Sequence, residues 1–359
     1  MLDVEDFETV FQIPSDDKGD DENQNSTLEY TDGLLQRITE NQRDLGGRTF
    51  FERLLELLQI KCKLQPRNPC CQSNLYSGRK IYPPSTNQQL RDLHKRIINA
   101  PISLHYKHCL FFYILKDLSP SHHSTTELAS TFARNVHLET RFWTFIEGLW
   151  ELDHMNFETA VGQLTHPSII PTFPDEIMLT LLNRRFYHGQ KAFDDVLPLA
   201  YYNCAKPPLV KEDVKTEFVK YMAGRNVTET FYWIRARPEY EHKALLDILI
   251  EETLDRSAWN SSDEEYTREE KAMEFVSLPF DDGEEAYVDH FLTEGKGRNF
   301  RGAGDTVMMR RIATGRLQQA ASDVAIRGRK HDNVNWDLLK DGVKRGLGPR
   351  RDEETPFVV

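Results

Sequence analysis

The residues best suited to bind a metal lie together in one stretch of the chain. His105, His108 and Cys109 form an HxxHC run, and the pair His122-His123 follows at a loop's distance. On a helix, His105 and Cys109 stand one turn apart and could share a metal ion. A structural zinc site normally uses four nitrogen or sulfur ligands in recognisable pairs, which this run does not supply. We therefore expect these side chains to pack or hydrogen-bond between helices, and we assign no metal site.

Acidic residues near two predicted helix ends could form acid/base clusters. Glu151, Asp153 and His154 stand at a helix break, and Asp175 and Glu176 stand at a helix start. Aspartate at a break can cap a helix, and carboxylates in a first turn are stabilised by the helix dipole. The sequence has no glycine-rich phosphate loop, GxSxG elbow, CxxC pair or HExxH helix. We assign no catalytic residue and no cofactor, and we expect neither enzymatic activity nor a small-molecule substrate.

The segment from Phe142 to Leu182 carries the clearest helical pattern. Two runs place apolar residues at i, i+3, i+4 and i+7, which predicts two helices that share one apolar face. The first run is Phe142, Phe145, Ile146 and Leu149, and the second is Phe157, Ala160, Val161 and Leu164. Pro167 and Pro171 end the second helix, because the residue before a proline is pushed out of the α region. Thr172 as a cap and Pro174 in the first turn predict a third helix.

This segment, with its GLW-x-LD and LTHPSIIPTFPDEI runs, resembles the ELYS-like domain family, whose members take part in nuclear pore complex assembly. A weaker likeness extends from about Phe50 to about Leu254. The resemblance implies a helical scaffold in the nucleus, at the nuclear envelope, that joins the outer-ring, Y-shaped nucleoporin complex and so serves mRNA and protein transport. Larger members add a β-propeller and a chromatin-binding tail with AT-hooks, whereas this chain resembles the short fungal members. Chromatin or nucleic-acid binding is therefore expected to be weak.

Helical patterns recur along the rest of the chain, and no strong period-2 alternation stands anywhere. The sequence predicts an all-α fold, an irregular α-solenoid of antiparallel helix pairs, because no strict repeat accompanies the helices. A helix over about 103–118 is apolar nearly all round, which predicts its burial. We expect an acidic, largely disordered segment over residues 1–47, an ELYS-like helical domain over 48–254, and a flexible tail over 255–359.

Charge is distributed unevenly around a net value of −12. Residues 14–30 are acidic and lack periodicity, which is typical of disorder. Residues 255–294 hold thirteen acidic and three basic residues, whereas residues 295–351 hold fourteen basic and five acidic residues. Such blocks are usually solvated or act as interaction tails. The basic stretch from Arg298 to Arg316 is interpreted as a nuclear-import patch rather than a nucleic-acid site, because no aromatic stacking platform accompanies it.

The cysteines and the apolar runs indicate the compartment. Five cysteines at irregular spacings do not form a disulfide framework, which fits a reducing nuclear or cytosolic setting. The first residues, MLDVEDFETVFQI, lack the basic and apolar regions of a secretory signal. No apolar run approaches the roughly 20 residues that a membrane-spanning helix needs. We expect the chain to reach a membrane-embedded assembly through partners and not by insertion.

A candidate interaction element lies near residues 333–347. Trp336, Leu339, Val343 and Leu347 form a narrow apolar stripe on a predicted helix, with charged residues around it. An isolated helix this short is marginal in water, so the stripe indicates a helix that folds on docking to a nucleoporin partner. The competing interpretation is that it packs back on the chain's own helices.

These observations lead to one function and two alternatives. We expect a non-enzymatic adaptor of the nuclear pore complex. A helical-repeat adaptor of another nuclear or proteolysis assembly would instead purify with other partners. A helical metal-dependent hydrolase built around His105 would contain metal.

Overall fold

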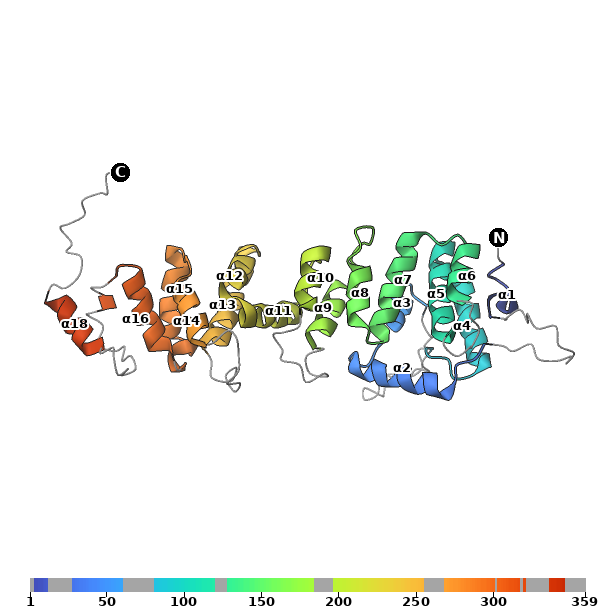
Figure 1. The fold of residues 1–359 in the computed structure, drawn as a ribbon, viewed down its shortest axis with the longest axis horizontal. Helices are drawn as coiled ribbons and strands as arrows, with labels where there is room; N and C mark the ends of the chain where they lie inside the picture. Colours follow the sequence, from blue (N-terminus) through green and yellow to red (C-terminus); the bar gives the residue numbers. More distant parts are fainter. Residues whose placement is uncertain are drawn as a thin grey trace, which may run out of the picture. The chain divides into compact units, whose positions relative to one another are not determined.

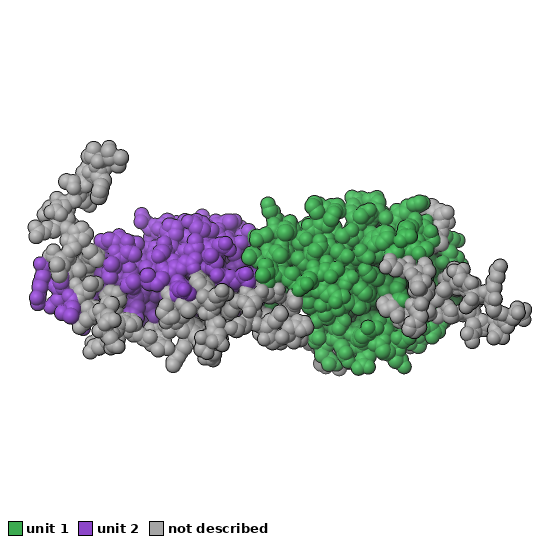
Figure 2. Space-filling model, in the orientation of Figure 1, with its two compact units in different colours: residues 1–183, 196–208 green, residues 184–195, 209–359 purple. Residues whose placement is uncertain are grey.

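The computed structural model describes most of the 359-residue chain, and the described residues form helices and no strand, which confirms the all-α prediction. The described residues are 3–11, 28–60, 81–119, 128–183, 196–254, 268–300, 302–316, 319–320 and 336–345. The chain divides into two compact units (Figure 2). Unit 1 comprises Met1–Asn183 and Val196–Pro208, and unit 2 comprises Arg184–Asp195 and Leu209–Val359.

Unit 1 is built around α5 and α7 (Figure 1). α5 (Leu104–Leu118) packs against α4 (Asn87–Asn99), α6 (Leu128–Asn135) and α7 (Thr140–Asp153). Every residue of α5 from position 108 to 115 is buried, as its nearly uniform apolar character predicts. α7 also packs against α2 (Asp32–Asp44), α3 (Phe50–Leu57) and α8 (Phe157–Leu164), and α10 (Leu197–Ala205) packs against α8 and α9 (Pro174–Asn183).

α7 and α8 are the two helices that the 142–164 pattern predicts, and they pack very closely. A Cβ atom placed on Gly148 of α7 would lie 2.6 Å from Cγ of Leu164 in α8. Only a residue without a side chain allows this approach, which explains the glycine of the GLW-x-LD run. The shared apolar face is shorter than predicted, because Phe142 and Phe145 are only partly buried at the start of α7.

The third predicted helix of this segment is α9, which begins at Pro174 with Asp175 and Glu176 in its first turn. The residues before it differ from the prediction. The Thr172 hydroxyl donates to the carbonyl oxygen of Ile170 at 3.2 Å. This bond holds the loop before the helix, whereas the predicted bond would have capped the helix itself.

In unit 2, helices pack against their neighbours in the chain, as in an α-solenoid. α11 (Glu212–Arg225), α12 (Val227–Arg235) and α13 (Glu239–Leu254) contact one another, and α14 (Arg268–Val276) packs on α12 and α13. α16 (Ala303–Ala313) packs on α14 and α15 (Asp282–Thr293), and the short 3₁₀-helix η4 (Lys296–Asn299) lies against α15 and α16. α18 (Trp336–Lys344) follows later in the chain.

Packed helices also occur in the segment that we expected to be largely disordered, residues 1–47. α1 (Phe7–Phe11) buries Phe11 completely, and α2 buries Leu34 and Ile38. His94 of α4 donates from Nε2 to the carbonyl oxygen of Val4 at 3.0 Å. Few apolar residues stand in this segment, but they recur at helical spacing and reach the core. Most of the acidic run over 14–30 lies outside the described residues.

The stretch that we expected to be a flexible tail, residues 255–359, likewise contains packed helices. Phe275 of α14, Val288 of α15 and Met308 of α16 are all buried. High charge alone suggested a solvated tail, but the charged residues surround a regular apolar pattern. The helical structure therefore continues to α16, well beyond residue 254.

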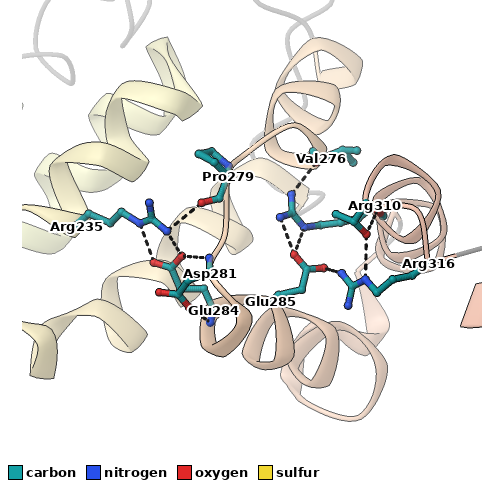
Figure 3. A network of polar contacts seen from close by, with 9 residues as sticks. Arg235, Val276, Pro279, Asp281, Glu284, Glu285, Arg310 and Arg316 are labelled. Atoms are coloured by element: carbon teal, nitrogen blue, oxygen red, sulfur yellow. Dashed lines mark hydrogen bonds and ion pairs between the residues drawn. The ribbon is translucent and has the colours of Figure 1, made fainter. Parts of the chain in front are cut away.

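The acidic and basic blocks of this region pair with each other (Figure 3). Glu285 of α15 accepts from Nε of Arg310 in α16 at 2.7 Å and also pairs with Arg316. Glu284 accepts from Nε of Arg235 in α12 at 3.0 Å. The switch in the sign of charge along the sequence thus corresponds to ion pairs of α15 with Arg310 and Arg316, and a further pair joins α15 to Arg235 of α12, outside the basic block.

These ion pairs overturn one expectation from the basic stretch. Arg310 is only 4% exposed and also donates to the carbonyl oxygen of Val276 at 2.7 Å. Arg311 is 8% exposed and pairs with Asp289 at 2.9 Å. The expectation of an exposed basic patch is therefore wrong for Arg310, Arg311 and Arg316, because carboxylates of α15 already hold their guanidinium groups.

Candidate functional site

The histidines and the cysteine of the HxxHC run do not converge on one point. His105 stacks on Phe142 with ring centroids 4.9 Å apart, whereas the buried His108 meets Phe132 edge-on. Burial raises the pKa of the Cys109 thiol to about 12, which disfavours the thiolate form that binds metals. Within the described ranges, no three His, Cys, Asp or Glu side chains gather as a metal would require, and His122-His123 lies outside those ranges.

Asp153, which the sequence suggested as part of an acid/base cluster, holds the start of another helix. Its two carboxylate oxygens accept from the backbone N–H groups of Phe50 and Phe51 in α3, at 2.6 and 3.0 Å. The Tyr113 hydroxyl donates to the same carboxylate at 2.7 Å. Burial raises the pKa of Asp153 to about 7, although these three donors act to lower it. Asp153 does cap a helix, as the sequence suggested, but that helix is α3, which lies about a hundred residues earlier in the sequence.

A second buried carboxylate, Asp117 of α5, gathers donors from three separate parts of unit 1. It accepts from the hydroxyl groups of Tyr30 and Tyr82 and, at 2.8 Å, from the indole Nε1 of Trp150. Burial raises the pKa of Asp117. The His154 ring lies 3.8 Å from the Trp150 ring, centroid to centroid, and its Nε2 lies 3.7 Å from Asp117. Sequence reasoning missed this network, because nothing in the local pattern around Asp117 indicates partners so far away.

These contacts leave the acidic residues engaged in structural roles. Glu151 lies 3.6 Å from the Lys116 ammonium group, and the same lysine pairs with Glu147 at 2.9 Å. Asp175 and Glu176 stand in the first turn of α9, where carboxylates stabilise the helix. Glu147, Glu151 and Asp153 thus each join α7 to a neighbouring helix, α5 or α3.

The described part of unit 1 contains a groove of about 390 Å³ between α3, α5, α7 and the loop 166–173, here called the α5–α7 groove. Its floor is apolar, since Leu54, Cys109 and Ile146 are buried beneath it. This volume lies within the range of known ligand pockets, roughly 300–1,000 Å³. The complete lining is Leu54, Leu58, His105, Tyr106, Cys109, Arg141, Phe142, Phe145, Ile146, Ser168, Ile169, Ile170 and Thr172.

A stack of flat side chains forms one wall of the groove. The Arg141 guanidinium lies 4.7 Å from the centroid of the Phe142 ring, and His105 stacks on that ring at an interplanar angle of 29°. The Tyr106 ring lies 4.5 Å from His105, centroid to centroid. The wall therefore offers aromatic faces together with one permanent positive charge.

The loop between α8 and α9 forms another wall of the groove, and the sequence keeps it out of helical conformation. Pro167 and Pro171 restrict their neighbours, and Ser168 bonds to the His166 ring with Nδ1 and Oγ 2.7 Å apart. Phe173 adopts a positive φ of 59°, which is strained for a bulky residue, and its ring packs near Phe50. The loop is therefore held in a defined shape even though it contains no regular structure.

Two large apolar residues of the lining, Ile170 and Tyr106, are exposed, and two more exposed leucines stand next to lining residues in the sequence. Ile170 at the loop tip is 81% exposed, Leu57 is 56%, Leu104 is 44% and Tyr106 is 39%. Leu57 precedes the lining residue Leu58, and Leu104 precedes His105. Exposed apolar groups that gather around a cavity are typical of protein interaction sites. The sequence signal was the LTHPSIIPTFPDEI run, but periodicity alone could not tell its exposed residues from buried ones.

The predicted docking stripe lies on a helix, because Trp336, Leu339 and Val343 all fall within α18. The side chains of these three residues, and Leu347 as a whole, lie outside the described part of the structure. Their role in partner binding stays a prediction.

Among the described helices, none has the length and apolar character needed to cross a membrane.

Comparison with known proteins gives a match to a protein family. The family described as "ELYS: Nuclear pore complex assembly" matches residues 48–295, a range that contains α3 through α15 and all residues that line the α5–α7 groove. A protein named "Uncharacterized protein ely5" from Schizosaccharomyces pombe is 31% identical over 107 residues. That match covers 30% of this chain and 33% of the relative, so the chain spans about a third of the relative's length. Because the family match covers well over half of its residues, the chain belongs to the ELYS family of nuclear pore complex assembly.

Proposed function

We propose that this chain is a non-enzymatic structural adaptor of the nuclear pore complex, which binds the outer-ring, Y-shaped nucleoporin complex and supports pore assembly at the nuclear envelope. The family match over residues 48–295 carries this proposal. A helical scaffold of packed pairs offers extended surfaces for other chains, as helical-repeat proteins do. Contact with the nuclear envelope would then pass through nucleoporin partners.

The chemistry of unit 1 supports an adaptor over an enzyme. The carboxylates of Asp117 and Asp153 are buried and already accept several hydrogen bonds from the protein. A general acid or base must be able to reach a substrate proton, which these groups cannot do while they hold α3 and the tyrosines.

We further propose that α18 acts as a second contact with an outer-ring nucleoporin. Its apolar positions 336, 339 and 343 recur at helical spacing, and position 347 would continue the stripe by one turn. Leu338, on the same helix, is 71% exposed. The adaptor would then have two separable contacts, one on the packed helices and one on this short element.

Affinity purification followed by mass spectrometry tests the proposed function. Two forms should be compared: the full chain, and a chain ending at Ala320 that keeps α1 to α16 but lacks α18. Ending the chain at Leu254 would remove α14, which packs on α12 and α13, and would leave their contact surface open. We expect both forms to recover outer-ring nucleoporins, the shorter one more weakly. Recovery of an unrelated nuclear or proteolysis complex by both forms would contradict the proposal.

A further inference from the structure

We infer that the α5–α7 groove is a docking site for a short apolar segment that carries a carboxylate, supplied by an outer-ring nucleoporin. The inference rests on the proposed function for the source of the segment. The shape of the groove, the exposure of its rim and the charge of its lining support it independently of the family.

The exposed lining residues Ile170 and Tyr106 have no structural need to be apolar. Ile170 stands 81% exposed at the tip of a loop that two prolines and the strained Phe173 hold in place. An isoleucine in this position leaves apolar surface in water, which is unfavourable unless another molecule covers it. Leu104 and Tyr106 stand exposed at the start of α5, and Tyr106 lines the same groove as Ile170. One inserted segment could therefore contact both walls at once.

The charge of the lining selects a carboxylate on that segment. Arg141 and His105 line the groove, and no aspartate or glutamate is among the lining residues. The nearby Glu139 pairs with Arg141 at 2.8 Å, and both side chains are more than half exposed. An exposed pair of this kind is weak, so an incoming carboxylate can compete with Glu139 for the Arg141 guanidinium group. The chain as a whole carries a net charge of −12, but the lining of this groove contains a basic residue and no acidic one, which suits an acidic, apolar segment.

The geometry favours a peptide over a lipid surface. A membrane-binding face would combine apolar groups with many lysines or arginines, whereas Arg141 is the one lysine or arginine in the lining. The groove is also concave and has a buried apolar floor, which suits the insertion of one or two side chains. A segment that lays an apolar side chain over Cys109 and Ile146 and a carboxylate beside Arg141 meets both requirements.

Overlapping peptides that cover the outer-ring nucleoporins provide the test. Each fluorescently labelled peptide is titrated with the full-length chain, followed by anisotropy. We expect one or a few peptides to bind, each containing apolar residues next to an aspartate or glutamate. Ile170→Asp should weaken that binding about tenfold or more, because it removes an apolar contact and adds a like charge. Val210→Asp is the matched control, since Val210 is an aliphatic residue 69% exposed in unit 2, and it should leave binding unchanged.

A charge exchange tests the carboxylate directly. Arg141→Glu should weaken binding of the acidic peptide. A peptide in which lysine replaces the acidic residue should regain affinity for the Arg141→Glu variant. Because Arg141 and Ile170 are exposed, thermal melts of both variants should match the wild type. If neither Ile170→Asp nor Arg141→Glu changes peptide binding, the inference is wrong. It is also wrong if the chain associates with itself and Ile170→Asp abolishes that association, because a second copy would then occupy the groove.

The same variants distinguish a failure of the groove inference from a failure of the proposed function. If the intact outer-ring complex binds wild type and Ile170→Asp equally well, the groove is not the docking site and the proposed function stands. If the intact complex binds neither, both the groove inference and the proposed function fail.

Discussion

Gly148 gives a quantitative test of the close packing between α7 and α8. Gly148→Ala would place a Cβ atom 2.6 Å from Cγ and 2.7 Å from Cδ2 of Leu164, well inside normal carbon contact. Leu164 is itself buried and has little room to retreat. Overpacking of this kind costs roughly 1–3 kcal/mol, whereas alanine gains about 1 kcal/mol over glycine in a helix interior. We therefore expect a net loss of about 0–2 kcal/mol of stability.

Gly162 of α8 supplies the matched control. A Cβ atom there meets nothing within 4 Å, so Gly162→Ala should stabilise the helix by up to about 1 kcal/mol. The helix-propensity gain is common to the two variants. Their difference in stability therefore isolates the overpacking cost, about 1–3 kcal/mol.

Hydrogen exchange of peptides from α7 and α8 is the suitable assay, because it reports local opening free energies. A global unfolding curve would mix the responses of the two units. Adding Leu164→Ala to Gly148→Ala should destabilise by less than the sum of the two single changes, since the smaller side chain makes room for the new Cβ. Equal gains in protection from Gly148→Ala and Gly162→Ala would refute the close approach of the two helices.

Three further predictions address the buried polar contacts and the tail helix. Burial raises the pKa of Asp153 from 3.8 to about 7, so the folded protein binds a proton at this carboxyl more tightly than the unfolded chain does. The resulting stabilisation of the fold is complete below about pH 4 and is lost as the pH rises through 7. Asp153→Asn should remove this part of the pH dependence, and thermal melts of both proteins from pH 4 to 8 check it; parallel curves would contradict the assignment. Glu285→Gln leaves two arginines without their carboxylate and should cost about 3–5 kcal/mol in exchange protection of α14 to α16, whereas Glu294→Gln at an exposed position should cost under about 1 kcal/mol. Combined Trp336→Ala and Leu339→Ala should weaken nucleoporin binding with an unchanged melt, and a lowered melt with intact binding would mean that α18 packs on its own chain.

The helices of unit 1 could be predicted where apolar spacing and prolines act locally. α7, α8 and the start of α9 at Pro174 follow directly from that pattern. The contacts of Asp117 and Asp153 could not be predicted, because their partners stand far away in sequence and only the fold brings them together. Asp153, for example, accepts from the backbone of Phe50.

The flanking helices were missed for a different physical reason. Their composition is strongly charged, and charge was taken to indicate solvation. In the fold, Glu285 and Arg310 neutralise each other, and Phe275 supplies the apolar contact that orders the region. Net composition therefore misleads where opposite charges separated in sequence meet in space.

The groove, too, could be predicted only in part from the sequence. The sequence indicated that the run between Leu164 and Pro174 is special, because so many prolines and apolar residues coincide there. It could not indicate that Ile170 faces solvent while Ile169 lines the groove more deeply, since exposure depends on how α5 and α7 lie against the loop.

Direct binding of the purified full-length chain to a reconstituted outer-ring nucleoporin complex tests the central claim most directly. Size-exclusion chromatography with light scattering would give the stoichiometry, and titration would give the affinity. We predict saturable binding of a defined number of copies, which persists at physiological salt because apolar contacts carry it. A chain that elutes separately from the complex at every concentration and salt tested would contradict the account.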